Sequence, residues 1–300
     1  MTLQVFLLQA FNGLSLFTVL LMMALGLAIV FGLMGVINLA HGELMAMGAY
    51  ATYATSLFFQ AFLPSLVNGY FVVGIVVAFA VTFAFGWLLE RGLIQFLYRR
   101  PLDTMLATWG VSLILQQVFR HAFGAKEVTV PTVSWLQGAV EVASGVSLPL
   151  NRIFIIGLAL IVTVVVYALL FRTRFGLRLR AVTQNRAMSA AAGINTERVD
   201  AMTFALGCGL AGIAGSSFTM LASTGPVTGQ QYIVDTFIVV VFGGVESLLG
   251  TILSSFLIAQ MQSSLEYVLT GSMAKATILL FVIAVLYFRP NGLFASKVRR

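Results

Sequence analysis

The chain has 300 residues, of which 60% are hydrophobic and 9% are charged, and its net charge is +7. Soluble domains carry about 25% charged and about 45–50% apolar residues, so this composition excludes a soluble globular domain and a disordered chain. Apolar stretches of roughly 20 residues can cross the ~30 Å hydrocarbon core of a bilayer. We therefore expect an all-α fold, a polytopic integral membrane helical bundle that residues 1–300 form as a single domain.

Eight or nine apolar stretches follow one another along the chain. They cover residues 14–34, two stretches within 44–89 that part near Pro64, and residues 104–123, 153–171, 202–221, 232–242, 251–269 and 274–288. The stretch 232–242 is short and is predicted to be either a full span or a half-span. Helix breaks are expected near residues 35–43 and 226–247, where glycines interrupt similar apolar sequences in the two halves of the chain.

Most of the basic residues lie in three loops, at residues 91–100, 172–200 and 289–300. Membrane proteins carry an excess of Lys and Arg in their cytoplasmic loops. This bias predicts that all three loops are cytoplasmic, with the N-terminus outside and the C-terminus inside. The same bias explains the positive net charge, so we do not expect the chain to bind nucleic acid.

The first polar group lies between two predicted spans and contains Asn38, His41 and Glu43, with glycines on both sides. Polar side chains within membranes usually face the bundle interior or an aqueous pathway. The alternatives here are a solute pathway and a tight polar turn at the membrane surface. A metal site is not expected, because His41 and Glu43 are two residues apart and face different sides of a helix.

Two further polar groups are candidates for the same pathway. They are Thr108, Trp109, Ser112, Gln116 and Gln117 in one span, and Gln230, Gln231, Tyr232 and Asp235 at the start of the short stretch. Hydrogen bonding between helices is the alternative for the first group. An extracellular cap is the alternative for the second group, whose position also suits a half-helix with its N-terminal dipole directed at the pathway.

The basic loop 172–200 contains a short predicted helix over residues 184–192, with Thr183 as its N-cap and Gly193 after its end. The small apolar face of this helix suits docking into a groove of another protein; a helix that lies on the bundle surface is the alternative. The sequence has no nucleophile–base pair, paired carboxylates or phosphate-binding glycine loop. We therefore expect neither catalysis nor ATP hydrolysis by this chain.

Three motifs resemble those of permease subunits of the branched-chain amino-acid type of ABC importer. They are Gly-Val-Ile-Asn-Leu-Ala-His-Gly-Glu at 35–43 with Gly-Ala-Tyr at 48–50, residues 174–181 with residues 190–194, and Arg-Pro-Asn-Gly-Leu-Phe at 289–294. The resemblance extends from about residue 10 to residue 296. Within the family, residues 100–117, 181–186 and 229–235 are most similar to the urea-transporting permease subunits.

This resemblance implies a multi-pass transport subunit of a bacterial inner membrane, without enzymatic activity and surrounded by lipid. A homologous second permease, two ATPase subunits and an extracytoplasmic substrate-binding protein would complete the importer. ATP and Mg would bind to the ATPase subunits, so no cofactor or metal is expected in this chain. Residues 172–200 would form the cytoplasmic coupling loop of the permease domain. Within that loop the candidate residues for ATPase coupling are Gln184, Arg186, Met188, Ala190, Gly193 and Ile194.

The resemblance to urea-transporting permease subunits implies that the cargo is urea. The chemistry of the polar residues gives an independent hint, because the N–H donors and the carbonyl acceptor of this neutral solute match Asn, Gln, Ser and Thr side chains. Residues 1–90 and 199–274 contain no Lys or Arg, whereas the carboxylate of an amino acid favours a cation or a helix N-terminus. The alternative cargoes are branched-chain amino acids and short-chain amides. A passive channel for a small neutral solute is the alternative from another functional class.

Overall fold

The structure, a computed structural model, describes residues 3–98, 100–143 and 146–294. The basic residues Arg99, Lys297, Arg299 and Arg300, which the orientation argument uses, lie outside the described residues. In chain order the elements are α1 (Leu3–Leu27), the π-helical turn η1 (Ala28–Leu33), α2 (His41–Phe62), η2 (Pro64–Gly69), α3 (Tyr70–Gly92), η3 (Ile94–Phe96), α4 (Pro101–Phe123), η4 (Ser134–Leu136), β1 (Ala139–Ala143), β2 (Val146–Pro149), α5 (Leu150–Arg172), α6 (Arg174–Gln184), α7 (Arg186–Ala191), α8 (Thr196–Phe218), α9 (Thr228–Gly243), α10 (Leu248–Glu266) and α11 (Gly271–Phe288). The two strands pair antiparallel.

Helices dominate the fold, as the composition predicts. Six helical stretches within the described residues are long and apolar enough to cross a membrane: Leu8–Leu33, Pro64–Phe96, Leu150–Arg172, Thr196–Phe218, Leu248–Glu266 and Gly271–Phe288. Helix α9 has 16 residues, fewer than the roughly 20 that a full span requires. The structure therefore supports a polytopic helical membrane protein, and the predicted count of eight or nine spans is not confirmed.

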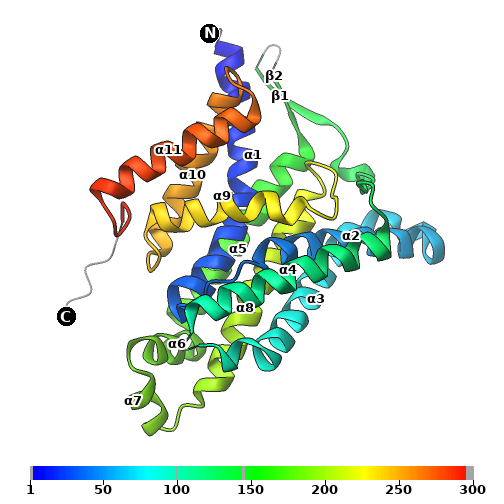
Figure 1. The fold of residues 1–300 in the computed structure, drawn as a ribbon. Coiled ribbons are helices and arrows are strands. Elements are labelled where there is room, and N and C mark those ends of the chain that lie inside the picture. The colour runs from blue at the N-terminus through cyan, green and yellow to red at the C-terminus, as the bar shows by residue number, and fades with distance from the viewer. Residues whose placement is uncertain (1–2, 99, 144–145, 295–300) are drawn as a thin grey trace.

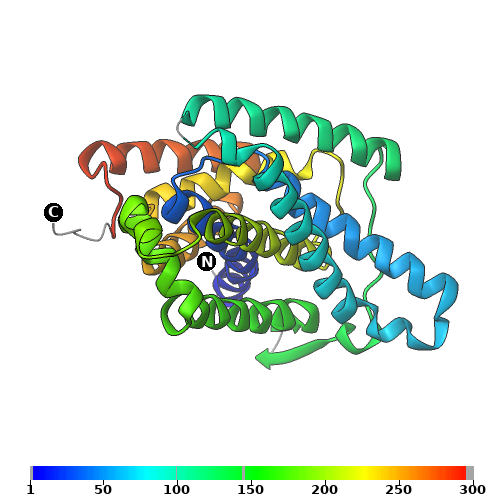
Figure 2. The same cartoon turned by 90° about the horizontal axis from the view of Figure 1, so that it is seen from below.

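Helices α1 and α8 form the centre of the bundle. Figure 2 shows them surrounded by the other helices, with α4 at one edge and α5 at the opposite edge. The most apolar stretch of α8 is 83% buried and that of the span containing α1 is 72% buried, whereas that of α11 is only 17% buried. The outer helices therefore expose apolar surface that suits lipid or another membrane helix.

Small residues let the central helices approach closely. Gly48 of α2 lies against Gly212 of α8, and Gly42 of α2 lies against Gly229 of α9. In both pairs a Cβ added to one glycine would overlap the backbone of the other. We call these two contacts the glycine pairs; they hold α2 backbone to backbone against two other helices.

The helix breaks expected from the sequence occur between helices. The chain leaves η1 through Gly35, whose φ of +69° favours glycine, and begins α2 at His41. Helix α9 is continuous from Thr228 to Gly243, and the second break follows it at Gly244, where φ is +99°. The two breaks lie together, because Gly32 packs against the backbone of Val245.

The basic loop forms α6 and α7 at the end of the bundle farthest from the N-terminus (Figure 1). Asn185 caps α7, since its side chain accepts a hydrogen bond from the Met188 N–H at 2.9 Å. The predicted cap at Thr183 is therefore wrong: Thr183 belongs to α6, and its hydroxyl donates to the Leu33 carbonyl at 2.9 Å. The predicted end is confirmed, because Gly193 follows α7 with φ +83°.

Candidate functional site

Three of the predicted pathway residues meet where α2 begins beside α4. The carboxyl of Glu43, which is 1% exposed, accepts hydrogen bonds at Oε1 from Gln116 Nε2 at 2.8 Å and from the Ser112 hydroxyl at 3.2 Å. Glu43 lies in the first turn of α2, where the helix dipole favours negative charge. We call these three residues the Glu43 cluster. It places amide and hydroxyl groups from α4 next to a buried carboxyl group.

The chain before α2 adds further buried polar groups to this region. The backbone N–H of Leu39 donates to the Thr108 hydroxyl at 3.1 Å, and the Asn38 side chain accepts from the Ala40 N–H at 3.0 Å. The ring of His41 contacts the Met23 carbonyl through Nε2 at 3.2 Å. In this region three buried polar atoms have no hydrogen-bond partner among the described residues: Asn38 Nδ2, His41 Nδ1 and Glu43 Oε2. Buried polar atoms are normally satisfied, so these three atoms mark the region as unusual for a packed interior.

The other predicted residues of α4 point away from the Glu43 cluster. Trp109 is 50% exposed and Gln117 is also exposed. Thr108, Ser112 and Gln116 are four residues apart and share the buried face, whereas the next residue along a helix is turned by about 100°. Helical spacing separates Gln117 from the buried face, but Trp109 lies only about 20° from Gln116 around the helix axis, so spacing alone does not predict its exposure.

The predicted residues of α9 divide in the same way. Gln230 and Gln231 are exposed, whereas Asp235 is buried. Asp235 Oδ2 forms an ion pair with Lys275 Nζ of α11 at 2.6 Å, and the same ammonium lies 5.4 Å from the ring centroid of Tyr232. Sequence reasoning missed Lys275. The available signal was a charged residue inside an apolar stretch, which marks a candidate functional position by itself.

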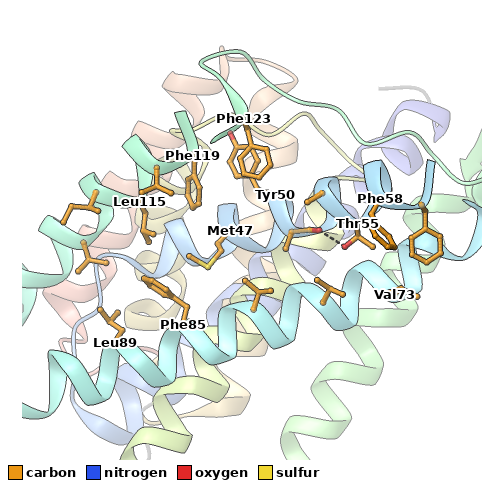
Figure 3. Close-up of a pocket in the computed structure, with 18 residues that line it drawn as sticks. Met47, Tyr50, Thr55, Phe58, Val73, Phe85, Leu89, Leu115, Phe119 and Phe123 are labelled. Carbon is orange, nitrogen blue, oxygen red and sulfur yellow. Dashed lines mark hydrogen bonds between the residues drawn. The ribbon is translucent and has the colours of Figure 1, made fainter. Parts of the chain in front are cut away.

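A cavity of about 980 Å³ lies between α2, α3 and α4 (Figure 3). Phe119 and Phe123 of α4 face Tyr50 of α2, and the ring centroids of Tyr50 and Phe123 are 4.4 Å apart. Phe85 and Leu89 line the α3 side. We call this cavity the lateral groove. Its lining is almost entirely apolar, so it suits a lipid chain or a membrane helix better than a polar solute.

A network of charged and aromatic residues ties α7 to the rest of the chain. Arg186 Nη1 forms an ion pair with Asp200 Oδ2 of α8 at 2.6 Å, and its guanidinium lies 5.3 Å from the ring centroid of Tyr98. The Tyr98 hydroxyl donates to Glu90 Oε1 of α3 at 2.6 Å. Burial and this hydrogen bond raise the pKa of Tyr98, so the hydroxyl keeps its proton at neutral pH. The network connects α7 with α8, with the end of α3 and with the segment that leads into α4.

The remaining coupling candidates lie on the exposed side of this segment. Met188 is 68% exposed, and Gln184, Ala190 and Gly193 are exposed. Ile194 is half-buried and packs against the main hydrophobic core. Arg186 differs from these residues, because its guanidinium forms an ion pair with Asp200 of the same chain.

Comparisons with known proteins identify one matching family over most of the chain. The family described as the permease component of branched-chain amino acid transport systems matches residues 9–288. The high-affinity branched-chain amino acid transport system permease protein LivH of Escherichia coli K12 is 26% identical over 300 residues, which cover 96% of this chain and 95% of LivH. BraD, the permease protein of the same type in Pseudomonas aeruginosa, is 28% identical over 303 residues, with 95% and 94% covered.

A sugar permease is also similar. The fructose import permease protein FruF of Bifidobacterium longum is 28% identical over 279 residues, which cover 89% of this chain and 72% of FruF. No solved structure matches the chain. Because the family match extends over nearly all of the described helices, the chain belongs to the family of permease components of branched-chain amino acid transport systems.

Proposed function

We propose that the chain is the permease subunit of an ABC importer that takes up branched-chain amino acids by alternating access. The observation that carries this proposal is the family match over residues 9–288. The similarity to LivH and BraD supports it, because it covers almost the full length of each relative. The substrate is not chemically altered. The free energy for its accumulation comes from ATP that is hydrolysed on separate subunits.

Urea, the cargo expected from the sequence, gains no support from the comparisons. Residues 1–90 and 199–274 contain no Lys or Arg, which by itself favours a neutral solute. Lys275 lies one residue beyond those stretches, and the fold brings it to Asp235. The chain therefore does place a partly exposed cation beside a buried carboxylate, and the similarity to LivH and BraD makes branched-chain amino acids the better proposal.

We assign the Glu43 cluster to the solute pathway and the exposed face of α7 to the ATPase contact. Met188 and Ala190 give α7 an exposed apolar side, which suits a groove on a partner. The network around Arg186 would then transmit movement of α7 to α3, α4 and α8. A homologous permease, two ATPase subunits and an extracytoplasmic binding protein complete the proposed importer, in a bacterial inner membrane with the N-terminus outside and the C-terminus inside.

Transport by the reconstituted importer tests the proposal. The complete complex in proteoliposomes, supplied with binding protein, should accumulate labelled leucine only when ATP is present. Isoleucine and valine should compete with leucine, whereas urea and acetamide should not. Uptake that continues without ATP would support a channel, and preferential uptake of urea would refute the amino-acid assignment.

A further inference from the structure

A second polar pocket lies at the end of the bundle opposite α7. Helix α5 begins at Leu150 and ends beside α6, so Arg152 lies at the end of α5 far from α6. Helix α8 begins just after α7 and ends at Phe218, so Phe218 lies at that same far end. Both residues line a pocket of about 420 Å³. The basic residues of α6 and α7 indicate that their end of the bundle is cytoplasmic. The pocket lies at the other end, so we call it the outer pocket.

The outer pocket carries one cation and one anion on different helices. Arg152 of α5 donates to the Asn12 side chain of α1, which uses one of its five N–H donors. Glu266, at the end of α10, accepts at Oε1 from Gln262 Nε2 at 2.9 Å. Both charged side chains line the pocket. The two charges are opposite in sign, as a zwitterion requires of its site.

Hydroxyl groups and an apolar wall complete the lining. Ser15 and Ser263 are 4% and 5% exposed, and each hydroxyl donates to a backbone carbonyl, so its oxygen stays available as an acceptor. Phe218 and Tyr232, whose ring centroids are 5.1 Å apart, give the pocket an apolar side. The volume falls within the range of about 300 to 1,000 Å³ that is typical of small-molecule sites.

We propose that the outer pocket is a reception site for a zwitterionic amino acid with an apolar side chain. Arg152 would bind the carboxylate through paired N–H donors. Glu266 and the serine oxygens would accept hydrogen bonds from the ammonium group, and the apolar side chain would lie against Phe218. This inference rests on the proposed function and adds to it where the amino acid first meets the permease.

A neutral solute would gain little from this arrangement. Urea carries no charge for Arg152 or Glu266 to bind, and burying unmatched charged groups against it would cost free energy. The charge pair therefore favours an amino acid over an amide at this position.

The test uses the complete importer in proteoliposomes with labelled leucine and loaded binding protein, first at a concentration that just saturates the unaltered importer and then at higher concentrations. Arg152→Gln and Glu266→Gln each remove a charge-assisted hydrogen bond, so initial uptake should fall roughly ten- to a hundredfold. Arg152→Lys keeps the cation and should retain more uptake than Arg152→Gln. Arg120→Gln and Glu141→Gln are the controls, because both residues are exposed and neither lines the outer pocket.

Two results would overturn the assignment of the outer pocket. Unchanged uptake in both variants would show that the pocket does not hold the substrate. Recovery of uptake at higher binding-protein concentration would show that the two residues dock the binding protein instead. If Arg152→Gln does not assemble, the exposed Glu266 decides the matter alone. Failure of the unaltered importer to take up leucine refutes the proposed function, whereas normal uptake with unaffected variants refutes only the outer pocket.

Discussion

The ion pair between Arg186 and Asp200 should contribute measurably to stability because its carboxylate is buried. The Asp200 side chain is 6% exposed and that of Arg186 is 49% exposed. Arg186→Ala leaves the carboxylate without its partner, a change that costs about 3–5 kcal/mol in a fully buried pair and about 0–1 kcal/mol at the surface. Since one partner is buried and the other half-exposed, we expect a loss of about 1.5–3 kcal/mol.

A double-mutant cycle separates the pair from other effects of the substitutions. Asp200→Asn alone returns Arg186 to solvent and should cost less than Arg186→Ala. The double variant should be more stable than the sum of the two losses predicts, with a coupling energy of about 1 kcal/mol or more. The measurement is unfolding of the purified protein in mixed micelles by increasing fractions of denaturing detergent. Arg172→Ala is the control, because Arg172 is exposed and surface substitutions stay within about 0.5 kcal/mol.

The result that refutes this reasoning is a cycle without coupling. Independent sites add to within about 0.3–0.5 kcal/mol. A coupling energy inside that range would mean that the ion pair does not hold α7 against α8. It would also remove the proposed path from α7 to the bundle.

Three further substitutions test other parts of the molecule. Met188→Asp places a charge on the exposed face of α7, so ATPase subunits should no longer co-purify although the permease still folds; unchanged co-purification contradicts the docking assignment. Gln116→Leu removes the 2.8 Å hydrogen bond to Glu43 and should lower leucine uptake more than protein level, whereas equal losses would indicate a structural role. Gly215→Ala adds a Cβ that overlaps the Met45 backbone, so folded yield should fall by an equivalent of about 1–3 kcal/mol; Gly110→Ala, where a Cβ meets no atom within 4 Å, should leave yield unchanged, and equal yields would contradict the close packing.

The sequence predicts where most of the long helices lie, but not how many of them cross the membrane or which faces meet. Apolar runs of about 20 residues identify the helices, because length and composition are local properties. The burial of Ser112 and Gln116 against Glu43 joins residues about 70 positions apart. Helical spacing groups Ser112 with Gln116, but it does not identify the helix they face. Helical spacing also groups Trp109 with Ser112 and Gln116, three and seven residues away, and only the fold shows that its side chain is 50% exposed.

The charged partners were harder to predict than the helices for the same reason. Lys275 and Arg152 each stand alone in the sequence, and only the fold brings them to Asp235 and to the outer pocket. The cap at Asn185 shows a local limit as well. Thr183 and Asn185 both suit an N-cap, and the choice depends on the hydrogen bond from Thr183 to Leu33 of a different helix.

The glycine pairs have a mechanical consequence for the alternating access proposed above. Interlocked side chains resist sliding, because each would have to leave one hollow and enter the next. At the contacts of Gly42 with Gly229 and of Gly48 with Gly212, two backbones touch with no side chain between them. Helix α2 can therefore slide past its neighbours by small distances without changes of side-chain rotamer. A larger side chain at either glycine pair would block this sliding and would also push the helices apart.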